Sequence, residues 1–67
     1  MIKKMKTQAQ HLQAGMVLAD SGFIVTRNAY ADDSTPFGWV RIEGHYPGDV
    51  LTMNEWKYRS VVSVVVD

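Results

Sequence analysis

The amino-acid sequence predicts a mainly β domain, with five short strands arranged as a small barrel or sandwich. Stretches rich in β-branched and aromatic residues alternate with turn signals roughly every eight to twelve residues, which is typical of such folds. No segment has the length and period of a core helix, and this excludes a parallel α/β sheet with helical crossovers. The chain has 67 residues, which is enough for one domain.

The beginning of the chain has two interpretations. Four apolar residues are spaced three or four apart, as on one face of a short helix: Ile2, Met5, Ala9 and Leu12. Gly15 would end that helix. Alternatively, residues 1–10 form a basic extended arm, followed by a single β domain over residues 11–67.

The rest of the chain consists of short strands separated by turns. The five expected strands are Met16–Ala19, Phe23–Tyr30, Trp39–Glu43, Asp49–Met53 and Ser60–Val66. Pro47-Gly48 suits a type II turn, residues 31–38 form a long loop, and residues 54–59 are expected to make one tight turn. Strict alternation in the third strand places Val40 and Ile42 toward the core and Trp39 and Arg41 on the opposite face.

Part of this pattern resembles small SH3-like barrels. The resemblance lies in His11-Leu12-Gln13-Ala14-Gly15-Met16-Val17-Leu18, where a Leu, two spacers and a Gly precede an apolar strand, and in Tyr46-Pro47-Gly48-Asp49-Val50-Leu51. Many such barrels have Asp after the first Gly, where this chain has Met16. The resemblance implies a five-stranded SH3-like barrel that binds a peptide, a nucleic acid or another protein. In size and style the chain also resembles short accessory proteins of bacteriophages.

The charge distribution bears on the class of partner. Seven basic and seven acidic side chains cancel, but the first seven residues carry +3 and the remainder −3. A domain that binds duplex nucleic acid is usually basic over its folded face, so the acidic body favours a protein partner. The chain has no Cys, no apolar stretch of membrane-spanning length and no signal-like apolar region, which indicates a cytoplasmic protein.

Catalytic and metal-binding constellations are weak, so we expect no enzyme, no cofactor and no metal. None of the serines lies in a nucleophile elbow. A contact between His45 and Asp49 is conceivable across the Pro-Gly turn, but a locally bonded turn histidine is the favoured interpretation. Asp32-Asp33-Ser34 resembles a fragment of a calcium loop without its Gly and Glu, and is better interpreted as an Asx-type turn.

Exposed aromatic residues are the main functional signal. An outward Trp beside an Arg, with further aromatic residues nearby, has the composition of a protein-binding hot spot. The expected partner-binding residues are Tyr30, Phe37, Trp39, Arg41 and Tyr46. The structural alternative is that Trp39 and Trp56 simply cover the open ends of the core.

A nucleic-acid or nucleotide ligand is the second hypothesis. Basic side chains would contact phosphates while Trp39 or Trp56 stacks on a base. Besides Arg41, the residues concerned are Lys3, Lys4, Lys6, Arg27, Lys57, Arg59 and Trp56.

The final strand is apolar on both faces, which predicts either burial on both sides or pairing with another chain. A terminal strand is a natural sheet edge, and an apolar edge aggregates unless it is covered. We therefore expect a homodimer that uses Val61, Val62, Val64, Val65 and Val66.

Overall fold

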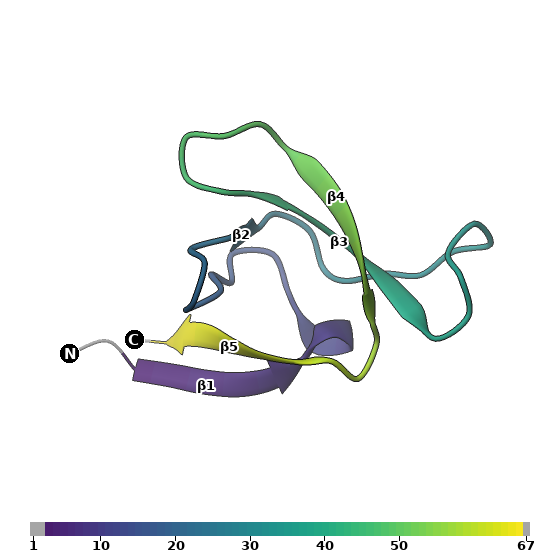
Figure 1. The fold of residues 1–67 in the computed structure, drawn as a ribbon, viewed down its shortest axis with the longest axis horizontal. Helices are drawn as coiled ribbons and strands as arrows, with labels where there is room; N and C mark the ends of the chain where they lie inside the picture. The colour runs from purple at the N-terminus through teal and green to yellow at the C-terminus, as the bar shows by residue number, and fades with distance from the viewer. Residues whose placement is uncertain (1–2, 67) are drawn as a thin grey trace.

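The computed structural model describes residues 3–66, which form two antiparallel sheets that cross one another (Figure 1). The first sheet pairs β1 (Lys3–Gln8) with β5 (Val61–Val66). The second has the order β2-β3-β4, with bounds Ile24–Val25, Trp39–His45 and Thr52–Lys57. A 3-10 helix, η1 (Ala9–His11), follows β1. The mainly β class is confirmed.

Within residues 3–66 the strands are divided between two sheets and do not close into a barrel. Single β-bridges join the two sheets on one side: Leu18 pairs with Val64, and Val17 pairs with Ile24. On the other side, no hydrogen-bonded pairing connects β1 to β4 within residues 3–66. The five strands therefore form a strongly curved arrangement that stays open between β1 and β4.

Of the two interpretations of the N-terminus, the helix is wrong within the described residues, because Lys3–Gln8 is an extended strand. It runs antiparallel to β5, with Met5 opposite Val64 and Gln8 opposite Val61. An isolated helix of this length is marginal in water, whereas a strand gains a full ladder of hydrogen bonds with β5. Ala9 and Leu12 are buried, as apolar spacing suggested, but from a 3-10 turn and the segment after it. Ile2 lies outside the described residues.

Strand boundaries differ from the sequence-based expectation at several places. Met16–Ala19 contributes only bridges, and Phe23–Tyr30 is a strand only at Ile24–Val25, with a further bridge from Tyr30 to Arg41. The fourth strand begins at Thr52 and continues through residues 54–57, where a tight turn was expected. That turn instead follows β4, where the amide of Ser60 donates to the carbonyl of Lys57 at 2.9 Å.

Two expectations for the β3–β4 hairpin are confirmed. Val40 and Ile42 are buried, while Trp39 and Arg41 are not. At the hairpin turn, the amide of Asp49 donates to the carbonyl of Tyr46 at 3.0 Å, and Gly48 has φ of 76°. A positive φ at the third residue of the turn is the type II geometry that Pro-Gly favours.

The core lies between the two sheets and is apolar. Its largest fully buried side chains are Phe23, Leu12, Ile42, Val25 and Val64. Trp56 is half-buried and packs against them, 6.0 Å from the Phe23 ring. None of the described polar or charged residues is buried. No helix among the described residues is long and apolar enough to cross a membrane.

Gly44 is required for this packing. A Cβ built there would lie 2.1 Å from the carbonyl oxygen of Ile24 and 2.7 Å from the Phe23 ring. Those distances are far inside van der Waals contact, so β2 and Phe23 approach β3 this closely only because residue 44 has no side chain.

We expect Gly44→Ala to lower the free energy of unfolding by about 3 kcal/mol, because the new methyl group forces the backbone of β2 away from β3. Gly48→Ala is the matched control: it has open space around it but a positive φ, which costs about 1–2 kcal/mol. Chemical denaturation of both variants measures the difference. Equal losses would contradict a packing role for Gly44.

Candidate functional site

The outer face of the three-stranded sheet carries the polar and aromatic residues that the sequence singled out. Trp39 and Arg41 project from β3 on the side opposite to Val40 and Ile42. In the antiparallel register, Trp39 lies opposite Lys57 and Arg41 opposite Glu55. Tyr30 forms a β-bridge with Arg41 on the other side of β3, so its side chain shares this face.

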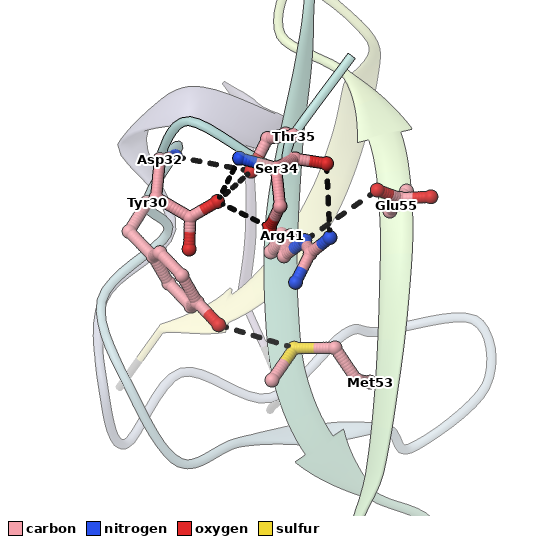
Figure 2. A network of polar contacts seen from close by, with 7 residues as sticks. All are labelled: Tyr30, Asp32, Ser34, Thr35, Arg41, Met53 and Glu55. Atoms are coloured by element: carbon pink, nitrogen blue, oxygen red, sulfur yellow. Dashed lines mark hydrogen bonds and ion pairs between the residues drawn. The ribbon is translucent and has the colours of Figure 1, made fainter.

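Arg41 is the centre of a polar network on this face (Figure 2). Its Nη2 donates to the carbonyl oxygen of Ser34 at 3.2 Å, and its Nε lies 3.5 Å from Oε2 of Glu55. That ion pair is not a hydrogen bond, so Nε has no hydrogen-bond acceptor among the described residues. A partly exposed ion pair of this kind contributes roughly 0–1 kcal/mol. The network therefore orients the guanidinium more than it stabilises the fold.

The loop before β3 is held by Asp32. Its Oδ1 accepts hydrogen bonds from the backbone amide and the hydroxyl of Ser34 and from the hydroxyl of Thr35. This is the Asx-type turn expected from the sequence. The Ser34 hydroxyl, then Thr35, then the Ser34 amide hold the pKa of Asp32 below its usual value of 3.8, with Arg41 adding a smaller effect.

Three exposed aromatic residues gather at the start of β3, and we call Phe37, Trp39 and Tyr58 the Trp39 surface. Trp39 separates two shallow hollows. One, of about 420 Å³, is lined by Trp39, Trp56, Lys57, Ser60 and Val62. The other, of about 300 Å³, is lined by Gln10, Ala31, Phe37, Gly38, Trp39, Val40 and Tyr58. Trp39 itself remains 37% exposed.

Phe37 is fully exposed because of the turn that carries it. The amide of Trp39 donates to the carbonyl of Pro36 at 3.1 Å, and Gly38 has φ of 84°. This is again a type II turn, with Phe37 at its second position, where a side chain points away from the turn. A single exposed apolar residue is ordinary, but Phe37 lies beside the exposed rings of Trp39 and Tyr58 around one hollow, and contiguous exposed apolar patches mark interaction sites.

Of the five expected partner-binding residues, Tyr46 is not brought to this site. It follows β3 at the far end from Trp39, about 23 Å away at ~3.3 Å per strand residue. Its ring packs edge-on against Phe23, with centroids 5.2 Å apart. Tyr30, Phe37, Trp39 and Arg41 do lie around the start of β3 and its outer face.

The basic residues of the nucleic-acid hypothesis are spread over the molecule. Arg27 stacks over Tyr30, and Arg59 over Tyr58, at 4.0 and 5.2 Å. Lys57 lines the larger hollow, whereas Lys3, Lys4 and Lys6 lie on β1 in the other sheet. Trp56 packs against the core, which is the structural alternative considered for it. Glu43 and Glu55 interrupt the positive charge on the outer face.

The premise that β5 is a free edge is wrong. On one side β5 pairs with β1, and on the other the amides of Val65 and Ala19 bond the carbonyls of Val17 and Ser63, both at 2.8 Å. Val64 is buried, and Val62 and Val66 pack against the core. Val65 is half-buried and Val61 is 62% exposed. The valines thus satisfy their hydrogen bonds within the chain, and the expected dimer through this strand stays a prediction.

The residues considered for catalysis and metal binding make only local contacts. His45 Nδ1 lies 3.0 Å from the carbonyl oxygen of Tyr46, and Asp49 Oδ1 accepts from the amide of Val50. Within residues 3–66, no three His, Asp or Glu side chains lie close enough together to hold a metal ion.

Two contributors to the site escaped the sequence analysis as site residues: Tyr58, and the Arg41 partner Glu55. Both belong to the stretch expected to be a turn. The hairpin register places Glu55 opposite Arg41, so a correct start for β4 would have revealed the pair.

No protein-family model, curated protein or solved structure matches this chain.

We expect Ser34→Ala to raise the pKa of Asp32 toward its usual value, because Ser34 supplies the largest of the hydrogen bonds that lower it. A depressed carboxyl pKa contributes stability that is present above the usual value and is lost as the pH falls through the folded-state value. Acidification below 3.8 should therefore loosen the wild-type loop. Carbon-detected NMR titration of Asp32 measures the shift, with Ser63→Ala as control. An unchanged pKa in Ser34→Ala would contradict this account.

Proposed function

We propose that this protein is a non-enzymatic binding module that docks a protein partner through the Trp39 surface and the adjacent Arg41. The observation that carries the proposal is the fully exposed Phe37 beside Trp39, with a hollow on each side of the indole. Aromatic residues and Arg are enriched among the few side chains that supply most of the binding energy in protein interfaces.

The geometry favours a rigid docking site. Phe37 is displayed by a type II turn, and Trp39 and Arg41 stand on a central strand that is paired on both sides. The Arg41 guanidinium is oriented by Ser34 and Glu55 before any partner arrives. Side chains that are already ordered lose less conformational entropy on binding, which raises affinity.

The hollows indicate what the partner presents. Their walls are mainly indole, valine and tyrosine side chains, with the Lys57 stem at one rim. A partner that inserts apolar side chains beside Trp39 and places a carboxylate near Lys57 would satisfy both features. The phage-type accessory role expected from the sequence stays a prediction. The features of the Trp39 surface bear on docking and not on that role.

A protein partner is favoured over a nucleic acid because the outer face has mixed charge. Glu43, Glu55 and the Asp32 turn lie among its basic residues, and phosphate backbones would be repelled by them. The observation that favours the alternative is that Lys57 and Arg59 lie beside two aromatic rings, Trp39 and Tyr58. Oligonucleotide binding that quenches tryptophan fluorescence and weakens steeply with salt would replace the protein-docking proposal.

We expect Phe37→Ala and Trp39→Ala each to weaken partner binding about tenfold or more, since both truncate central aromatic contacts. Phe37→Ala should change the free energy of unfolding by less than about 0.5 kcal/mol, because the side chain contacts little in the free protein. Nuclease-treated bacterial lysate is passed over immobilised wild type and variants, and captured proteins are quantified.

Met5→Ala is the matched control, an exposed apolar residue on the other sheet. The proposal requires at least one protein retained by wild type and Met5→Ala and lost by both aromatic variants. If every captured protein binds all four chains equally, the Trp39 surface is not the docking site.

A further inference from the structure

The unpaired edge of β4 is the second surface of functional interest. The amide of Tyr58 donates to the carbonyl of Gly38, while Arg41 exchanges both of its backbone hydrogen bonds with Tyr30. Along an antiparallel pair of strands, residues that hydrogen-bond to the neighbouring strand alternate with residues that do not. Because Tyr58, directly after β4, bonds to β3, the even-numbered residues of β4 do so as well. The backbone groups of Met53 and Glu55 therefore point away from the sheet, and no described segment pairs with them.

The other unpaired edge, on β1, is different in character. Odd-numbered residues of β5 bond to residues 17–19, so its even-numbered residues bond to β1. In the β1–β5 register these face odd-numbered residues of β1. The backbone groups of Lys4 and Lys6 therefore point outward at this edge. Closely spaced lysines on an edge strand oppose pairing with another chain. The edge of β4 carries Met53 and Glu55 along its length and a single lysine, Lys57, at its last residue, so it lacks the closely spaced lysines of β1.

We propose that β4 pairs antiparallel with β4 of a second copy about a two-fold axis through Asn54. This register places Met53 opposite the partner's Glu55 and Thr52 opposite the partner's Trp56. Each Met53–Glu55 pair would exchange both backbone hydrogen bonds across the edge. The two three-stranded sheets would become one continuous sheet, with the same patch used by both copies.

Charge and the length of β4 that is paired select this register from its neighbours. Shifting the axis to residue 55 would place Glu55 directly opposite the partner's Glu55, and like charges in that position are destabilising. Shifting it to residue 53 would leave only the beginning of β4 paired. The axis at Asn54 keeps most of β4 in the ladder and opposes no like charges.

Exposed apolar residues just before β4 support pairing with a second copy in this register. Before β4, the adjacent side chains of Val50 and Leu51 are 73% and 58% exposed. Extending the register places Leu51 opposite the partner's Lys57 and Val50 opposite the partner's Tyr58. Each copy would thus set its apolar hairpin tip beside its partner's larger hollow, which Lys57 lines.

Sedimentation equilibrium of the full chain, from micromolar to millimolar concentration, tests the pairing. The mass should rise from 7.6 kDa toward twice that value and no further. Glu55→Pro removes an amide that points out of the sheet, a position where an edge strand tolerates proline, and should leave a folded monomer. Lys4→Pro removes the equivalent amide from the edge of β1 and should still dimerise.

Met53→Glu provides a second variant that leaves the backbone unchanged. It places a carboxylate opposite the partner's Glu55 twice per dimer and should raise the dissociation constant roughly tenfold. The double variant Met53→Glu/Glu55→Lys restores opposite charges across the edge and should recover dimerisation.

Amide hydrogen exchange locates the interface. In the dimer, the amides of Met53 and Glu55 should exchange more slowly than those of Lys4 and Lys6. A monomer at millimolar concentration would overturn the proposal. So would a dimer that survives both Glu55→Pro and Met53→Glu, or assemblies that grow beyond two copies, as pairing of β4 with β1 would produce.

Discussion

The close approach of Phe23 and β2 to Gly44 sets the orientation of every side chain on β3. Phe23 is almost fully buried, and its ring contacts the place where a side chain at residue 44 would lie. With Gly44 facing inward, Ile42 and Val40 must face inward too, because strand side chains alternate. Trp39 and Arg41 then have only the outer face available. A shift of one residue would bury Arg41 and expose Ile42, so the candidate docking face depends on a packing contact that it does not touch.

This dependence explains which parts of the site could be predicted from the sequence. The alternation of Trp39-Val40-Arg41-Ile42 is strong enough that both faces of β3 were assigned correctly. The residues of β4 that lie opposite β3 were not assigned correctly, because Val50 and Leu51 have side chains typical of strands and the fourth strand was expected to begin too early. The Tyr46–Asp49 turn decides where the hairpin pairs, and it sets β4 to begin at Thr52. Tyr46 was misplaced for a related reason: an extended strand carries residues that are near in sequence far apart in space.

The pairing of the two chain ends was the least predictable part of the fold. The spacing of apolar residues near the N-terminus suggested a helix, and the valines of β5 suggested an edge strand that pairs with a second copy of the chain. In fact β5 is paired on both sides. Its even-numbered residues hydrogen-bond to β1, and its odd-numbered residues hydrogen-bond to residues 17–19. Contacts between segments this distant leave no periodic signal in either one. Tertiary pairing therefore overrides local preference here.

The same pairing leaves the sheet open between β1 and β4, and so determines where a further strand could be added. The two sheets, joined by single bridges, leave β1 and β4 as unpaired edges among the described residues. Lys4 and Lys6 protect the edge of β1, while the edge of β4 adjoins the Trp39 surface. Because a two-fold axis perpendicular to the sheet keeps like faces on the same side, pairing through β4 would present two Trp39 surfaces toward one partner. Two linked sites bind more tightly than either alone when both can be engaged. For a domain this small, with a shallow surface built on one indole, assembly through the β4 edge would supply affinity that a single copy lacks.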